Sequence, residues 1–210
     1  MSGFFLSIEG VDGAGKSTQA RLLAERLRAA GREVELTREP GGAPGAEEIR
    51  RLLLTGDPGR WSPMTEVLLF FAARRDHLER TILPALARGA VVICDRFTDS
   101  TRAYQAAARE DAAGAGRALI DLLHEQAIGL DPDLTLIFDM DPKTALTRGL
   151  ARDTDEARFE RLGAGFQTRL RENFLAIAAE NPARCRVIDA AGDMDQVAAR
   201  IWAETGPALG

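Results

Sequence analysis

Short apolar runs alternate along the chain with longer segments whose apolar residues recur every three or four positions. The short runs are residues 4–8, 33–37, 90–94, 134–138 and 185–188, and their length and composition predict strands. Strands that alternate with helices are typical of βαβ units. The pattern therefore predicts an α/β fold in which a five-stranded, mainly parallel sheet is flanked by helices.

Three longer segments carry the apolar stripe of a helix. The first follows the run 4–8 and is expected to stop at Gly31, because glycine readily takes the left-handed conformation that ends helices. The second follows Pro63 and is expected to end at Pro84, and the third ends near Gly129. Residues 108–116 are small and polar and are expected to form a loop.

Directly after the first predicted strand, residues 10–17 match the phosphate-binding pattern G-x-x-x-x-G-K-[ST]. Glycines let the loop bring its N–H groups close to phosphate oxygens, while Lys16 reaches the β- and γ-phosphates and Ser17 reaches Mg²⁺. The basic residues are almost all arginines, so a lysine at the motif position favours this interpretation over a simple turn. The residues expected to bind ATP are Gly10, Val11, Asp12, Gly13, Ala14, Gly15, Lys16, Ser17 and Thr18.

The run 90–94 leads into Asp95 and Arg96. An aspartate at the carboxyl end of a buried parallel strand lies where α/β folds hold ligands, so we expect Asp95 to orient Mg²⁺ together with Ser17. Arg96 suits a position between donor and acceptor phosphates, although a structural Asp95–Arg96 ion pair is the alternative. Asp12 either adds a second carboxylate here or caps its own loop.

Composition narrows the class of protein. The formal net charge is -5 and the arginines are interleaved with acidic residues, which argues against binding to a nucleic-acid polymer. Cys94 and Cys185 lie in apolar runs and are expected to be free and buried, as in a reducing compartment. No signal peptide or membrane span is evident. We therefore expect one cytoplasmic domain over residues 1–210.

Four ordered motifs resemble the thymidylate kinase family: residues 8–17, 37–42, 69–74 and 95–105. The phosphate loop alone is shared by many functions, but the ordered set is far more specific. The resemblance implies a P-loop NTPase-type fold and transfer of the ATP γ-phosphate to dTMP, giving dTDP. It also implies a homodimer.

In this family reading, Phe70 stacks on the thymine ring and Arg74 hydrogen-bonds its carbonyl edge. Thr101 and Gln105 resemble the pair that reads the remaining base edge, and Tyr104 resembles the residue packed against the sugar. Core packing is the alternative for Phe70, and an ordinary half-buried aromatic is the alternative for Tyr104. The substrate-binding residues that the resemblance implies are Asp12, Arg38, Phe70, Arg74, Arg96, Ser100, Thr101, Tyr104 and Gln105.

An arginine-rich segment, roughly residues 148–160, resembles the lid of the family branch that carries its catalytic arginine there rather than in the phosphate loop. Gly13 and Ala14 fit that branch, because the loop itself has no arginine. A solvated segment of mixed charge is the alternative. The catalytic residues implied are Lys16, Arg96, Arg152 and Arg148.

Other functions share part of this pattern. A kinase for dUMP or a deoxynucleoside shares the same motifs, and an ATP-binding module without catalysis is a further alternative. A GTPase needs an Asn-Lys-x-Asp element, whereas neither Asn173 nor Asn181 is followed by lysine. His77 and His124 lie in helical segments without a partner motif and are expected to be incidental.

Overall fold

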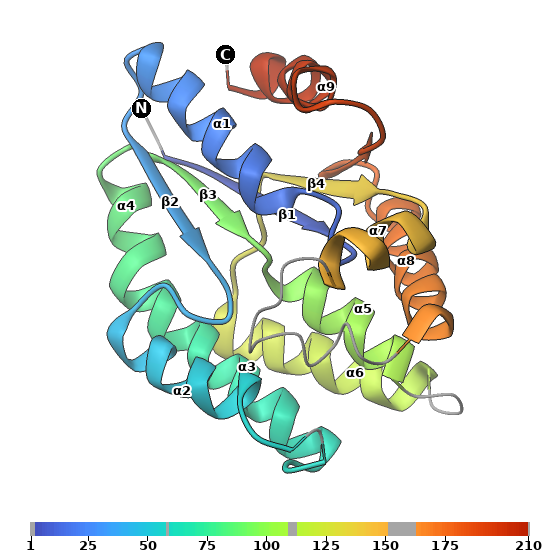
Figure 1. Ribbon diagram of the computed structural model, residues 1–210. Coiled ribbons are helices and arrows are strands. Elements are labelled where there is room, and N and C mark those ends of the chain that lie inside the picture. Colours follow the sequence, from blue (N-terminus) through green and yellow to red (C-terminus); the bar gives the residue numbers. More distant parts are fainter. Residues whose placement is uncertain (1–2, 58, 109–112, 151–162, 210) are drawn as a thin grey trace.

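The computed structural model describes residues 3–57, 59–108, 113–150 and 163–209. Its centre is one sheet of parallel strands in the order β2-β3-β1-β4-β5 (Figure 1), which confirms the predicted sheet. The strands are β1 (Phe4–Gly10), β2 (Val34–Arg38), β3 (Val91–Asp95), β4 (Leu134–Asp139) and β5 (Cys185–Asp189). Each strand ends one or two residues later than predicted, because pairing continues through polar and glycine positions that an apolar run does not include.

Helices cover both faces of the sheet. Figure 1 shows α1 and α9 on one side and α3, α4, α5 and α6 on the other. Their bounds are α1 (Lys16–Ala29), α2 (Pro44–Leu54), α3 (Pro63–His77), α4 (Leu83–Ala87), α5 (Thr98–Ala108), α6 (Ala113–Leu123), α7 (Pro142–Leu150), α8 (Gly163–Glu180) and α9 (Met194–Ala208). Two π-helical turns, η1 (Leu78–Ile82) and η2 (His124–Ile128), follow α3 and α6. None of the helices in the described ranges is both long enough and apolar enough to cross a membrane.

Two predicted boundaries were wrong. Pro84 does not end the helix that follows Pro63, because α3 runs through η1 into α4 and Pro84 lies in the first turn of α4. A first-turn residue needs no N–H for the helix, so proline is tolerated there. Part of the expected loop at 108–116 is helical instead, since α5 extends to Ala108 and α6 begins at Ala113.

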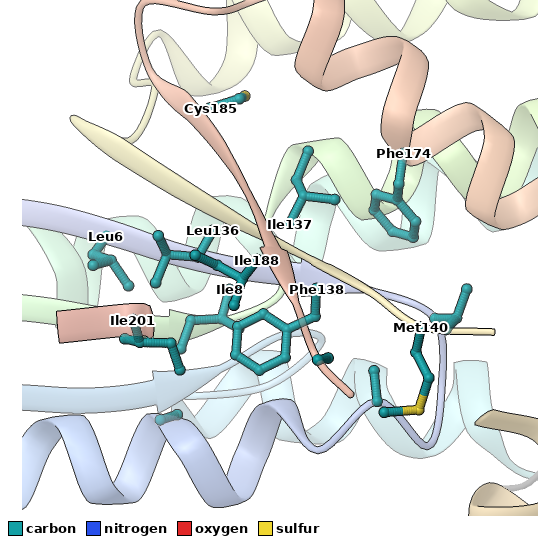
Figure 2. Close-up of a cluster of buried hydrophobic side chains, with 14 of the residues drawn as sticks. Leu6, Ile8, Leu136, Ile137, Phe138, Met140, Phe174, Cys185, Ile188 and Ile201 are labelled. Carbon is teal, nitrogen blue, oxygen red and sulfur yellow. The ribbon is translucent and has the colours of Figure 1, made fainter. Parts of the chain in front are cut away.

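Apolar alternation along β1 builds the core on both sides of the sheet. Leu6 and Ile8 belong to one buried cluster together with Ile201 of α9 (Figure 2), whereas Phe5 belongs to a second cluster with Phe97. The rings of Phe5 and Phe97 meet edge to face with their centroids 5.0 Å apart. This packing fixes the sheet, and so fixes the edge at which the strands end.

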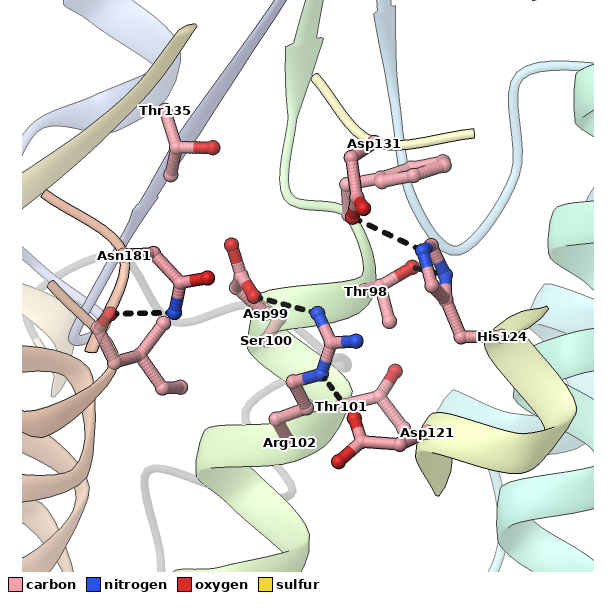
Figure 3. A network of polar contacts seen from close by, with 12 residues as sticks. Thr98, Asp99, Ser100, Thr101, Arg102, Asp121, His124, Asp131, Thr135 and Asn181 are labelled. Atoms are coloured by element: carbon pink, nitrogen blue, oxygen red, sulfur yellow. Dashed lines mark hydrogen bonds and ion pairs between the residues drawn. The ribbon is translucent and has the colours of Figure 1, made fainter. Parts of the chain in front are cut away.

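A network of ion pairs anchors the N-terminal end of α5 (Figure 3). Asp99 is 97% buried at its side chain and pairs with Arg184 Nη1 at 2.6 Å and Arg102 Nη1 at 2.9 Å. Arg102 continues to Asp121 of α6 at 2.8 Å. The network therefore holds in place the helix that carries four of the predicted substrate-binding residues: Ser100, Thr101, Tyr104 and Gln105.

His124 was expected to be incidental because its segment carries no partner motif, but the structure gives its side chain two polar partners. Its Nδ1 lies 3.1 Å from Thr98 Oγ1 and its Nε2 lies 3.0 Å from an Asp131 carboxylate oxygen (Figure 3). Thr98 lies 26 residues earlier in the chain and Asp131 lies just beyond η2, and the helical pattern around His124 revealed neither partner.

Candidate active site

The phosphate loop connects β1 to α1, so its N–H groups lie at the positive end of the α1 dipole. Gly13 has φ +83°, and a Cβ there would lie 2.0 Å from the carbonyl oxygen of Ala145 in α7. Only glycine fits this position. The requirement inferred from the motif spacing thus has a direct steric cause in the structure.

Lys16, the first residue of α1, is only 6% exposed. Its Nζ donates a hydrogen bond to the Val11 carbonyl at 2.8 Å, across the loop. Burial, followed by the nearby Arg96 cation, lowers the pKa of Lys16 to about 8. A cation held in this way gains strongly from an anion that enters the loop.

Ser17 and Asp95 meet where α1 begins and β3 ends. The Ser17 hydroxyl donates to a carboxylate oxygen of Asp95 at 2.5 Å. A hydroxyl and a carboxylate are the oxygen ligands that Mg²⁺ prefers. The pair expected from the sequence is therefore in contact, and its donor set fits this ion.

Arg96 is the centre of the site, and its backbone has φ +76° although it is not glycine. Its Nη2 donates to Asp12 Oδ1 and to the Tyr104 hydroxyl, while Nη1 donates to Ser100 Oγ and to the Gly10 carbonyl. The Asp95–Arg96 ion pair, which was the alternative interpretation, is absent from the described residues, because Arg96 pairs with Asp12 instead. A strained backbone that persists in a dense network is typical of functional sites.

Asp12 receives two of these bonds. Its Oδ1 accepts from Arg96 at 2.5 Å and its Oδ2 accepts from the Tyr104 hydroxyl at 2.6 Å. Burial acts to raise the pKa of Asp12, but Arg96 and Lys16 outweigh it and hold that pKa below its ordinary value. Asp12 is therefore ionised and binds Arg96 rather than capping its loop.

Glu9 is a site residue that the sequence interpretation missed. It is fully buried, and it accepts hydrogen bonds from the Phe97 N–H at 2.7 Å and from Ser100 Oγ at 2.5 Å. These bonds hold the turn on either side of Arg96. A charged residue inside the apolar strand β1 was the available signal.

Glu9→Gln is expected to weaken the pH dependence of stability. Burial, followed by the charge of Asp99, raises the pKa of Glu9 from 4.5 to about 8. The folded chain thus binds the extra proton more tightly, and this contribution to stability is full below about pH 4.5 and is lost as the pH rises towards about 8. Glutamine is neutral throughout, so the decline of the melting temperature between about pH 5 and pH 8 should be smaller by a few °C.

Thermal unfolding of both proteins across this range measures the effect. Lys16 does not interfere, because its lowered pKa of about 8 changes stability only above that pH, and in the opposite direction. Parallel curves for the two proteins would contradict the role given to Glu9.

A second group of predicted residues lies between α3 and α5. Arg74 is 3% exposed, with Nε 2.7 Å from Glu39 Oε2 and Nη2 3.1 Å from Thr101 Oγ1. Its buried Nη1 has no hydrogen-bond partner among the residues that the structure describes. Phe70, one turn earlier, is half-buried, whereas its neighbour Phe71 is 3% exposed and belongs to the core. Phe70 is therefore available to a ligand.

Glu39 and His77 were also missed, and His77 is not incidental. Its Nδ1 lies 3.0 Å from Glu39 Oε1 and its Nε2 lies 2.7 Å from Thr37 Oγ1, with no exposed surface. Cys94 lies close to Glu39 and His77, but Arg74 and Thr37 already use their polar atoms. The group thus supports Arg74 and is not built as a metal site. The Glu39–Pro40 peptide that leads into this motif is cis.

An open pocket joins the phosphate loop to the ends of β2 and β3. Arg38 reaches it with a half-exposed side chain that also pairs with Glu47 at 3.1 Å. The remaining lining residues are Asp12, Gly13, Gly15, Lys16, Ser17, Glu39, Arg50, Asp95 and Arg96. Most of the residues predicted to handle phosphate thus meet in one place.

Only part of the predicted lid lies in the described residues. Arg148, near the end of α7, is exposed and its Nη1 lies 3.8 Å from Met140 Sδ. Arg152 lies outside the described residues, as do residues 151–162 as a whole. Arg148 is not among the residues that line the pocket.

Comparison with known proteins gives a consistent result. The family model described as thymidylate kinase matches residues 8–201. Thymidylate kinase of Ruegeria pomeroyi is 62% identical over 200 residues, which cover 95% of this chain and 93% of that protein. Thymidylate kinase of Caulobacter vibrioides is 56% identical, covering 95% and 94%. The crystal structure of thymidylate kinase from Ehrlichia chaffeensis superposes with a TM-score of 0.77 at 34% identity, covering 98% of this chain and 100% of that one.

Proposed function

This chain belongs to the thymidylate kinase family, and on that premise we propose which of its residues carry out the reaction. The enzyme phosphorylates dTMP to dTDP with ATP, in nucleotide biosynthesis. Phosphoryl transfer depends on alignment and charge neutralisation rather than on a covalent intermediate. The roles below therefore concern position and charge.

The phosphate loop and Lys16 bind the ATP phosphates. N–H groups of the loop and the buried Lys16 ammonium surround the β- and γ-phosphates, whose negative charge offsets the burial and the Arg96 charge that lower the pKa of Lys16. Ser17 and Asp95 hold Mg²⁺, and this assignment is supported by their contact at 2.5 Å. Bound there, the ion neutralises phosphate charge.

Arg96 acts between the donor and acceptor phosphates. Asp12 and Ser100 fix its guanidinium at the pocket wall, so little reorganisation is needed when charge develops on the transferred group. Arg38 reaches the same pocket and binds the dTMP phosphate. An oxygen of that phosphate attacks the γ-phosphorus of ATP.

The base lies against α3, with Phe70 stacked on its ring. The observation that carries this proposal is the buried, unpartnered Nη1 of Arg74 among the described residues, since an orphaned buried donor is costly unless a ligand accepts from it. The O4 carbonyl of thymine supplies that acceptor. Thr101 accepts a hydrogen bond from Arg74 Nη2. Gln105 hydrogen-bonds the neighbouring edge of the base, and Tyr104 packs against the sugar.

Arg74→Met is expected to raise the KM for dTMP at least about tenfold while changing kcat less, because it removes a charged donor from the bound base. ADP release with dTMP, dUMP, dCMP, UMP, AMP, GMP and thymidine measures the effect. The surface variant Arg75→Met, which loses an exposed pair with Glu79 and a hydrogen bond to the Ala127 carbonyl, serves as the matched control. An unchanged KM for dTMP in Arg74→Met would show that the base binds elsewhere.

We propose that the whole chain forms one domain with a lid at roughly residues 148–160. Arg148 and Arg152 of this lid approach the phosphates when nucleotides bind. Closure of such a segment excludes water while charge develops. The exposed position of Arg148 at the end of α7 supports this role, because the side chain is not committed to the core.

We also propose a homodimer in the cytoplasm. Exposed apolar side chains on α2, α3, α4 and α6 support an interface between copies: Leu52, Met64, Leu68, Leu83 and Leu122. Light scattering during gel filtration distinguishes a dimer from a monomer. The free, buried Cys94 and Cys185 suit a reducing compartment, and cell fractionation tests the location.

A further inference from the structure

Two helices face each other across the proposed base site, and side chains at helical spacing join them. On α3, Glu66, Phe70 and Arg74 are four residues apart and so lie on one face. On α5, Thr101 and Gln105 have the same spacing. Both helices lie on the same side of the sheet in Figure 1, and residues of the two are in contact.

Two polar contacts bridge the helices, one on either side of Phe70 along α3. Arg74 Nη2 donates to Thr101 Oγ1 at 3.1 Å, and Gln105 Nε2 donates to Glu66 Oε1 at 3.4 Å. Glu66 is 7% exposed and Gln105 is 6% exposed. The second contact therefore pairs a buried carboxylate with a buried amide, and neither group has a role in the phosphate chemistry.

Chemistry fixes which group donates and which accepts in the hydrogen bond between Gln105 and Glu66. A carboxylate has no proton to donate, so only the NH₂ group of Gln105 can bond to Glu66. The amide of Gln105 cannot turn over without placing its oxygen against the carboxylate oxygen. Its Oε1 is thereby left to accept a hydrogen bond from a ligand.

We propose that Glu66 is a positioning residue that makes the enzyme select pyrimidines with a protonated N3. This inference rests on the proposed function, in which Gln105 reads the base. Thymine and uracil present an acceptor at O4 and a donor at N3–H, which match the Arg74 donor and the Gln105 acceptor. Cytosine presents an amino donor at N4 and an acceptor at N3, so it meets a like group at both positions. Glu66 affects recognition at N3, through Gln105, without touching the base.

Glu66→Gln tests the proposal, because an amide at position 66 accepts either orientation of Gln105. The KM for dTMP is expected to rise about tenfold, with kcat within about twofold of the parent value, since a hydrogen bond to the bound base is no longer pre-set. The preference for dTMP over dCMP, measured as the ratio of kcat/KM values, is expected to fall about tenfold. Glu79→Gln is the matched control, because it makes the same change at an exposed ion pair with Arg75.

A reversed pair separates positioning from simple packing. In the double variant Glu66→Gln with Gln105→Glu, residue 66 donates and residue 105 keeps an acceptor for N3–H. The double variant should recover the low KM for dTMP and the preference over dCMP, and it provides this readout even where Glu66→Gln alone folds poorly. A purely structural role for Glu66 predicts no such recovery of base preference, and that result would overturn the proposal.

Gln105→Ala separates failure of this inference from failure of the proposed function. A raised KM for dTMP in Gln105→Ala, together with normal KM and base preference in Glu66→Gln, would overturn the inference and keep Gln105 as a base reader. A normal KM in Gln105→Ala would overturn both, because Gln105 would then not contact the base. Circular dichroism melting of each variant identifies the folded fraction used for kinetics.

Discussion

Replacing Lys16 with alanine is expected to lower kcat by about a thousandfold, the scale of losing a principal charge-stabilising group. The side chain is 6% exposed, spans the phosphate loop to the Val11 carbonyl and lines the pocket beside Arg96. Its charge neutralises the γ-phosphate as the bond to the leaving oxygen breaks. No other lysine can substitute, because the only other one, Lys143, is exposed on α7.

Lys143→Ala is therefore the natural control for Lys16→Ala. It removes the same side chain from the surface and should leave kcat and KM unchanged. Steady-state ADP release, with protein concentration corrected for the folded fraction, measures both. A folded Lys16→Ala enzyme that turns over at a near-normal rate would remove Lys16 from the mechanism.

Arg96→Ala is expected to lower kcat by a similar factor, about a thousandfold. The loss has two parts. The transferred phosphoryl group loses a guanidinium held by Asp12 and Ser100, and Asp12 is left as an ionised carboxylate beside Tyr104 without its ion pair. We therefore also expect a lower melting temperature, since breaking a partly buried pair leaves an uncompensated charge.

Arg96→Lys separates these two effects. Lysine keeps a positive charge near Asp12 and so should recover much of the lost stability, but a single ammonium cannot bond to all the oxygens that the fork of Arg96 reaches. Its kcat should therefore remain at least about a hundredfold below the parent value. Recovery of turnover in parallel with stability would mean that Arg96 serves the fold alone. Arg88→Lys, at an exposed pair with Glu33, is the control.

The phosphate end of the site could be predicted because its residues are close together in the chain. Residues 10–17 form one loop, and Asp95 and Arg96 directly follow a strand whose carboxyl end must lie at the same sheet edge. The contact between Ser17 and Asp95 follows from the parallel pairing of β1 with β3. The local motif and the geometry of the parallel sheet are therefore enough to predict the phosphate end of the site.

The residues that sequence interpretation missed act through partners distant in the chain. Glu9 accepts from Ser100, His77 meets Glu39 and Thr37, and Glu66 meets Gln105. Glu9 stands out as a charged residue in an apolar strand, whereas the helical patterns around His77 and Glu66 are explained by packing alone. In none of the three cases does the local sequence identify the partner, because only folding brings the two residues together.

The sequence by itself determined the alternation of strands and helices, the phosphate loop with Lys16, and the family to which its motifs belong. These depend on side-chain period and on glycine geometry, which are properties of neighbouring residues. The tertiary structure alone decided that Arg96 pairs with Asp12, that Gln105 donates to Glu66, and that one buried donor of Arg74 has no partner among the described residues. Hydrogen bonds act over about 3 Å, so a polar group's role is fixed only when packing sets which atoms lie within that distance.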